Sequence, residues 1–85
     1  METAQARLKR LAMRSWRRGT KEMDLILGPY SDAHLSGMDE GSLQRYDSLL
    51  NENDQDLYQW VSGQGKGPAE FASLLQHIIK HTKTR

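Results

Sequence analysis

Apolar residues recur at helical spacing through most of this 85-residue chain. The segment from about Thr3 to Arg18 places apolar and small residues on one side and arginines on the other. The positions expected to face a core are Leu8, Leu11, Ala12, Ser15 and Trp16. The next segment repeats the pattern at i, i+3, i+4, i+7 and i+11, with Met23, Ile26, Leu27, Tyr30 and His34. Both patterns are typical of amphipathic α-helices.

The second pattern runs across Gly28 and Pro29 without a change of register. A proline inside a helix removes one backbone hydrogen bond and crowds the preceding turn. We therefore expect one helix with a kink at this point. Two short helices that meet at Gly28 are the alternative.

Between these two segments lies the run Arg17-Arg18-Gly19-Thr20-Lys21-Glu22. Gly19 fits the position just past a helix end, where a left-handed backbone is favoured. Thr20 is suited to cap the second helix, and Glu22 then lies near the positive end of the helix dipole.

Two further helices are expected in the middle of the chain. Ser36, with Asp39 three residues later, predicts a capping box at the start of the third helix. The apolar face of that helix comprises Leu43, Tyr46, Leu49 and Leu50. Asn53 or Asp54 is expected to cap a short fourth helix, which Gly63 ends. The apolar residues of the fourth helix are Leu57, Tyr58, Trp60 and Val61.

The glycine-rich run 63–67 is expected to be the loosest part of the chain, and Pro68 suits the first position of a last helix. The buried stripe of that helix is predicted to be Phe71, Leu74, Leu75 and Ile78, with Ile79 at its edge. No stretch alternates convincingly at period two, and β-branched residues are scarce. The sequence therefore predicts an all-α bundle of about five helices, two of them short. Residues 1–85 are expected to form a single domain with frayed ends at 1–5 and 82–85.

Composition narrows the classes of function. A chain this short buries roughly 60% of the surface that its unfolded form exposes, which leaves little room for a catalytic cleft. Because the chain has no cysteine, disulfides and thiolate metal sites are excluded. A mean hydropathy of −0.78 and the lack of a long apolar run exclude a transmembrane helix, so no membrane partner is expected.

The net charge of +1 hides a segregation of charge along the chain. Residues 1–21 carry one acidic residue, Glu2, against Arg7, Lys9, Arg10, Arg14, Arg17, Arg18 and Lys21. Among residues 32–56, every charged side chain except that of Arg45 is acidic. This asymmetry favours charge-steered binding to nucleic acid or to an acidic protein surface, and a solvated helix face explains it equally well. The Arg-rich start also resembles an organelle-targeting peptide, but it leads into the junction without a spacer and is interpreted as part of the fold.

Three motifs that resemble ligand sites lack essential parts. The 63–67 run follows an expected helix, whereas phosphate-binding glycine loops follow a strand. His77 and His81 share a helix face, but a zinc site needs a third ligand, and interaction with the helix dipole is the ordinary explanation. The acidic run 51–56 has Asp56 where a calcium loop needs glycine, and Ser62 where it needs glutamate. No nucleophile is paired with a base. We expect no metal site, no catalytic residue and no enzymatic activity.

The junction therefore holds the only concentrated chemistry in the sequence. It is either generic helix punctuation or a contact site in which Arg18 offers a planar, multi-donor fork to a partner. In the second case Glu22 orients the arginine or accepts from the partner. A DNA-binding helix-turn-helix is a further alternative. The second helix of such a unit reads the groove, whereas here it is apolar and contains Glu22 and Asp24.

The junction resembles the R-G-x-x-E signature of the succinate dehydrogenase assembly factor 2 family, also called FAD assembly factors. Its flanks, Trp16-Arg17 and Met23-Asp24-Leu25-Ile26-Leu27, are similar to the family pattern. A second similar block runs from Tyr46 through Glu52 and is followed by Asp56-Leu57-Tyr58-Gln59-Trp60.

This resemblance implies a small all-α assembly chaperone that binds the flavoprotein subunit of succinate dehydrogenase, and in some bacteria that of fumarate reductase. Members promote covalent attachment of FAD to a histidine of that subunit. The implied contact residues are Arg18, Gly19 and Glu22, with Arg17 beside them. We expect FAD to belong to the partner and not to be held stably by this chain, which is expected to be a monomer that binds no nucleic acid. A small basic DNA-binding domain is the alternative. With no presequence before the motif, a bacterial cytoplasmic location is expected.

Overall fold

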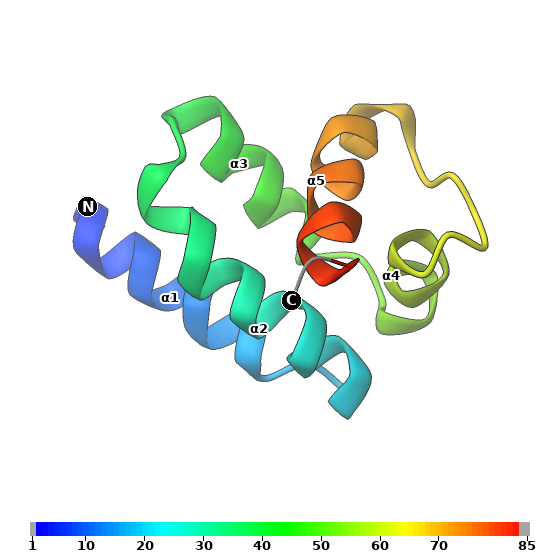
Figure 1. Ribbon diagram of the computed structural model, residues 1–85. Helices are drawn as coiled ribbons and strands as arrows, with labels where there is room; N and C mark the ends of the chain where they lie inside the picture. Colours follow the sequence, from blue (N-terminus) through cyan, green and yellow to red (C-terminus); the bar gives the residue numbers. More distant parts are fainter. Residues whose placement is uncertain (1, 84–85) are drawn as a thin grey trace.

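A computed structural model describes residues 2–83 and shows a helical bundle (Figure 1). Its elements, with η denoting a 3-10 turn, are α1 (Ala4–Trp16), α2 (Lys21–His34), η1 (Leu35–Gly37), α3 (Glu40–Leu49), α4 (Asp54–Val61), η2 (Ala69–Phe71) and α5 (Ala72–Lys83). None of the described residues lies in a strand, so the predicted all-α bundle of five helices is confirmed. The predicted fraying stays a prediction, and Met1, Thr84 and Arg85 lie outside the described residues. No helix within residues 2–83 has the length and apolar character to cross a lipid bilayer.

Helix α2 is the central element of the bundle, because it contacts α1, α4 and α5. In Figure 1, α1 and α2 lie side by side and are joined by the tight junction 17–20, while α3 and α5 lie above this pair in the view. The junction also lies close to the start of α4, because Arg18 and Gly19 both bond to Asp54, although these residues are far apart in sequence.

Helix α2 continues without interruption through Gly28 and Pro29, as the hydrophobic register predicts, so the alternative of two short helices is wrong. The Trp16 indole covers this point: a Cβ built on Gly28 would lie 2.3–2.5 Å from ring atoms of Trp16. The indole Nε1 donates to both carboxylate oxygens of Asp32, at 3.2 and 3.3 Å. Trp16 was predicted to face the core, but it remains 41% exposed because it lies across the outer surface of α2.

Thr3, Thr20, Asp39 and Asn53 cap α1, α2, α3 and α4, each side chain accepting from a backbone N–H three residues on. The caps expected at Thr20 and Asn53 are confirmed. The capping box expected at Ser36 is wrong, because residues 35–37 form η1 and delay the start of α3 until Asp39 can cap it.

The last helix also begins later than expected. Pro68 precedes η2 with an extended backbone and is therefore not the first residue of α5. Gly63 ends α4 as predicted, with φ at 85°.

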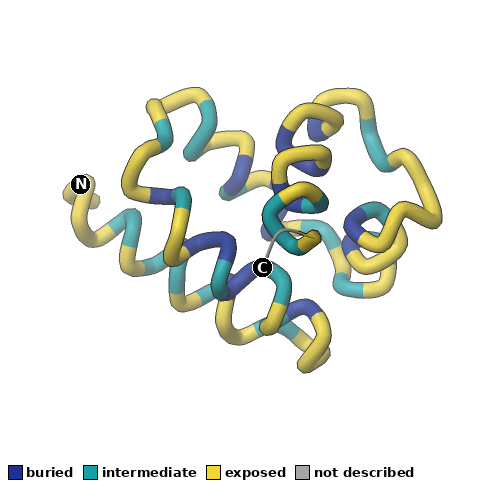
Figure 2. The backbone as a smooth tube through the Cα atoms, viewed as in Figure 1, coloured by how far each residue is buried: buried dark blue, intermediate teal, exposed yellow. Residues whose placement is uncertain are grey.

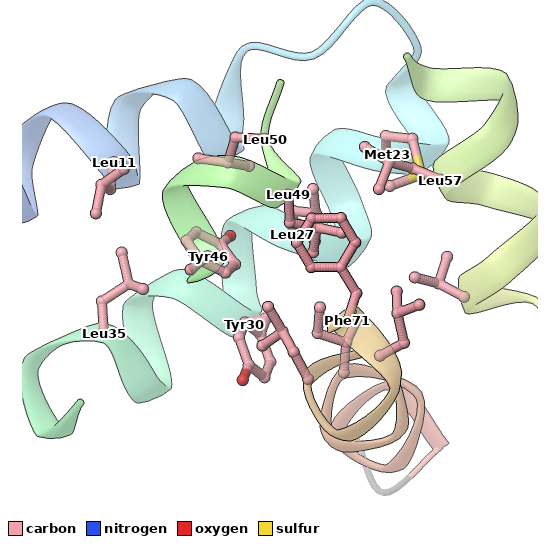
Figure 3. Packing of buried hydrophobic residues seen from close by; sticks show 14 residues of the cluster. Leu11, Met23, Leu27, Tyr30, Leu35, Tyr46, Leu49, Leu50, Leu57 and Phe71 are labelled. Atoms are coloured by element: carbon pink, nitrogen blue, oxygen red, sulfur yellow. The ribbon is translucent and has the colours of Figure 1, made fainter. Parts of the chain in front are cut away.

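Each of the five helices has buried residues (Figure 2), and their apolar side chains meet in one core (Figure 3). Its buried members are Leu11, Met23, Leu27, Tyr30, Leu35, Tyr46, Leu49, Leu50, Leu57, Val61, Phe71, Leu74, Leu75 and Ile78. The core confirms most of the predicted faces, with the exceptions of Trp16 and Tyr58, which are 41% and 42% exposed.

A polar contact crosses the core between α1 and α3. Ser15 Oγ donates to the carbonyl of Leu11 at 2.8 Å and lies 2.6 Å from the Tyr46 hydroxyl. Because the single hydroxyl hydrogen of Ser15 is used in this way, Tyr46 is the donor to Ser15. Both residues are fully buried, and burial raises the pKa of the Tyr46 phenol.

Candidate functional site

The junction between α1 and α2 is held by hydrogen bonds to its own backbone. Thr20 Oγ1 accepts from Met23 N at 3.3 Å and so caps α2. Asp24 Oδ1 accepts from Arg18 N at 2.5 Å, which closes the turn from the α2 side. The bend thus has a defined conformation before any partner is considered.

The guanidinium of Arg18 bonds within the protein. Its Nε donates to Asp54 Oδ1, its Nη1 to the carbonyl of Leu50 and its Nη2 to the carbonyl of Glu52, each at 2.8 Å. The two carbonyls belong to the end of α3 and the connection to α4, where a helix leaves carbonyl groups without intrahelical partners. The Arg18 side chain is consequently only 10% exposed. The expectation of an exposed arginine fork is wrong, because a planar fork matches these three acceptors.

Gly19 has a physical role different from the one expected. Its φ is not positive, since Gly63 and Gly67 are the glycines with positive φ among the described residues. Its N–H instead donates to Asp54 Oδ2, and a Cβ at this position would lie 2.6 Å from the same oxygen. Gly19 is therefore required by the close approach of Asp54, and the prediction of a left-handed residue is wrong.

Asp54 is the residue that sequence reasoning missed. One carboxylate oxygen accepts from Arg18 and the other from Gly19, so this single side chain binds the first two residues of the signature. Asp54 lies 36 and 35 positions from them. Its place beside Asn53 in the sequence predicted only a helix cap, which Asn53 provides.

Glu22 and Arg17 remain at the surface. The carboxylate of Glu22 makes no ion pair or hydrogen bond with any described residue, so the expectation that it orients Arg18 is wrong. Asp24 and Asp54 hold that arginine instead. The assignment of Arg17, Arg18, Gly19 and Glu22 to partner binding stays a prediction, and the structure places Arg17, Gly19 and Glu22 where a partner can reach them.

A hollow of about 410 Å³ lies beside the junction. Glu22 and Thr20 form its α2 side, and the remaining lining residues are Asp54, Gln55, Tyr58, Gln59 and Gln64. Signature and second block thus meet at one surface feature, although more than thirty residues separate them in sequence.

The arginines on the basic face of α1 are largely paired. Arg7 bonds Glu40 at 2.7 Å, and Arg10 and Arg14 share Asp47 at 3.1 and 2.7 Å. Hydrogen bonding from Arg10, and then from Arg14, holds the pKa of the Asp47 carboxyl below its usual value. The acidic middle of the chain therefore neutralises the basic start within the molecule, which weakens the nucleic-acid alternative.

The three histidines of the chain gather around Tyr30 between α2 and α5. The Tyr30 hydroxyl lies 2.8 Å from His77 Nδ1, and His34 Nε2 lies 3.2 Å from His81 Nδ1. Burial raises the pKa of Tyr30 to about 12; burial and the nearby His77 and His81 lower the pKa of His34. His81 lies in the last turn of α5, and His34 in that of α2, as the dipole interpretation requires. His77 lies one turn earlier in α5, so this interpretation is wrong for His77, whose contact with Tyr30 was not foreseen. Within residues 2–83 no group of three or more His, Cys, Asp or Glu side chains is arranged to hold a metal ion.

The sequence is similar to one family of known proteins. A family model described as flavinator of succinate dehydrogenase matches residues 9–82. Among curated proteins, similar sequences are named succinate dehydrogenase assembly factor 2, mitochondrial. The one from Aspergillus flavus is 45% identical over 62% of this chain and 18% of its own length. The one from Meyerozyma guilliermondii is 38% identical over 72% of this chain and 45% of its own length. The one from Aedes aegypti is 34% identical over 96% of this chain and 53% of its own length. The chain therefore spans about half the length of these relatives or less.

These matches contradict the expected bacterial cytoplasmic location, because the relatives are eukaryotic proteins named as mitochondrial. That expectation rested on the position of the motif near the first residue. Since the chain covers only part of its relatives, its first residue carries no information about a leader.

Proposed function

Because this chain belongs to the family of flavinators of succinate dehydrogenase, we propose that it is an assembly chaperone that binds the flavoprotein subunit and promotes covalent attachment of FAD. The match across residues 9–82 carries this proposal. Support comes from the defined bend at the signature, which leaves Glu22 and Arg17 at the surface.

The FAD is held by the partner. The glycine-rich run 63–67 lies between α4 and η2, so it is not the strand-to-helix turn on which dinucleotide phosphates are bound. The flavin supplies the electrophile and a histidine of the partner supplies the nucleophile, and the residues of this chain act only by binding. The chain acts as a monomer that binds neither nucleic acid nor membrane.

A binding chaperone promotes the reaction by selecting a conformation. If the flavoprotein interconverts between a loose form and one with flavin and histidine in line, a helper that binds the second form more tightly raises its population. Each tenfold preference in affinity corresponds to about 1.4 kcal/mol of shift in that equilibrium. No group of the helper has to enter the reaction.

The test is reconstitution of flavinylation. Purified flavoprotein is incubated with FAD in the presence and absence of this chain, and covalent flavin is read by fluorescence in a denaturing gel. We expect the chain to increase the rate of covalent labelling. Equal labelling with and without it refutes the proposal.

Among variants for this assay, Glu22→Ala best separates an effect on partner binding from an effect on folding. Glu22 is exposed and has no described partner, so the variant should keep the circular dichroism of the parent and lose stimulation. Gly19→Arg is less informative, since any Cβ at position 19 meets Asp54 and disturbs the bend. Glu70→Ala, which removes another exposed glutamate outside the junction, is the matched control and should stimulate normally.

A further inference from the structure

The hollow between the junction and α4 contains a carboxylate that pairs with no basic side chain of the described residues. Two carboxylates line it, those of Glu22 and Asp54. Asp54 is occupied on both oxygens, by Arg18 Nε and Gly19 N. Glu22 has no such partner among the described residues. Because the positive charge of Arg18 is paired with Asp54, the negative charge of Glu22 has no basic side chain within residues 2–83 as its partner.

The other lining groups favour a cation with several N–H donors. Gln55, Gln59 and Gln64 line the hollow, and the oxygen of each side-chain amide can accept a hydrogen bond. Tyr58 is 42% exposed and contributes an aromatic ring to the same hollow. The negative face of an aromatic ring attracts cations, and among protein side chains it is arginine that most often stacks on it. An anion is disfavoured by Glu22, and an apolar group leaves the amides without partners.

We infer that this hollow binds an arginine side chain of the flavoprotein partner. Arginine fits better than lysine because its planar guanidinium offers five donors, enough to engage the Glu22 carboxylate and a glutamine oxygen while its plane rests on Tyr58. The inference rests on the proposed function for the identity of the partner. It deepens that proposal by assigning the chemistry of the contact at Glu22 and by adding α4 residues to it.

Measurement of affinity for the flavoprotein tests the inference directly. Titration calorimetry compares the parent chain with Glu22→Gln, which keeps the shape and removes the charge, and with Glu70→Gln as control. We expect Glu22→Gln to weaken binding about tenfold or more and to reduce its dependence on salt, because a charge-assisted pair is lost. Tyr58→Leu should also weaken binding, and Tyr58→Phe, which keeps the aromatic face, should weaken it less than Tyr58→Leu does.

Equal binding by Glu22→Gln and the parent overturns the inference and leaves the proposed function standing. Failure of the parent chain itself to bind the flavoprotein overturns the proposed function instead. The chemistry of the hollow is then decided with N-acetyl-arginine amide and its neutral analogue N-acetyl-citrulline amide as probes, followed by NMR on the side-chain amides of Gln55, Gln59 and Gln64. Saturable shifts with the arginine probe alone support an arginine site, and equal or absent shifts with both probes overturn it.

Discussion

Substitution of Gly19 by alanine separates two explanations for a glycine at this position. A left-handed glycine resists any side chain wherever its neighbours lie. Gly19 has no positive φ, and the obstacle to a Cβ is Asp54 Oδ2 at 2.6 Å. The methyl group must therefore displace the Asp54 carboxylate, which breaks its bonds to Gly19 N and Arg18 Nε.

The expected loss follows from the burial of this pair. The side chains of Arg18 and Asp54 are 10% and 14% exposed, so water screens them little. A hydrogen bond to a charged group contributes about 1.5–3 kcal/mol, and the other donors of Arg18 keep their carbonyl acceptors. The alanine also restricts the unfolded chain, which offsets about 0.4–1 kcal/mol. With both bonds of Asp54 lost, we expect a net destabilisation of at least about 2 kcal/mol, or a fall in Tm of at least about 8 °C for a domain of this size.

A double-mutant cycle read by urea unfolding tests this mechanism. Gly19→Ala is measured in the parent chain and again in an Asp54→Ala background, where the obstructing carboxylate is absent. The cost of Gly19→Ala should fall to less than about 0.5 kcal/mol in that background, which gives a coupling energy of about 2 kcal/mol. An equal cost in both backgrounds would refute the reasoning, because it would place the strain in the backbone rather than in the contact with Asp54.

Three further changes test other parts of the structure. Because the pKa of His34 is lowered in the folded state from its ordinary 6.5, its contribution to stability is fully present above about pH 6.5 and is lost as the pH falls through the folded-state pKa. His34→Gln should flatten that acid limb in pH-dependent urea unfolding, and an unchanged slope would contradict the assignment. Ser15→Ala leaves the buried hydroxyl of Tyr46 without its acceptor and should cost about 1–3 kcal/mol, with partial recovery when Tyr46→Phe is added; a lack of recovery would exclude this hydrogen bond as the cause. Gly28→Ala should displace the indole of Trp16, seen as a shifted Nε1–H resonance, and an unmoved resonance would show that the helix adapts instead.

The parts of the fold that sequence predicted correctly are those fixed by neighbours three or four residues apart. The stripe of Met23, Leu27 and Tyr30 is buried because successive turns of one helix share a face. That register carried α2 through Pro29 correctly, because the buried face outweighs one missing hydrogen bond. Thr20 was identifiable as a cap because its acceptor and the N–H it binds lie three residues apart.

The parts that sequence missed depend on distant contacts. The acceptors of Arg18 lie 32 to 36 residues away, so the motif alone presented its fork as available. Gly19 was assigned a backbone role because local spacing shows helix ends but not the approach of Asp54. Ser36 was assigned as the cap of the third helix because the local spacing fits a capping box, but the 3-10 turn at residues 35–37 moves the start of α3 so that Asp39 caps it.

The residues of the signature fall into two groups: Arg18 and Gly19 contact other parts of the protein, and Glu22 faces the surface. Arg18 and Gly19 are bound by Asp54 at the start of α4, so they fix where α4 stands relative to α2. Glu22 faces outward, and the hollow beside it is completed by Tyr58 of the same α4. A substitution at Arg18 or Gly19 therefore alters the proposed contact surface by moving α4, even without a partner touching the substituted residue. A loss of partner binding in such a variant therefore reports on the contacts of Asp54 with Arg18 and Gly19. Only substitutions at Glu22 and Tyr58 report on the contact with the partner.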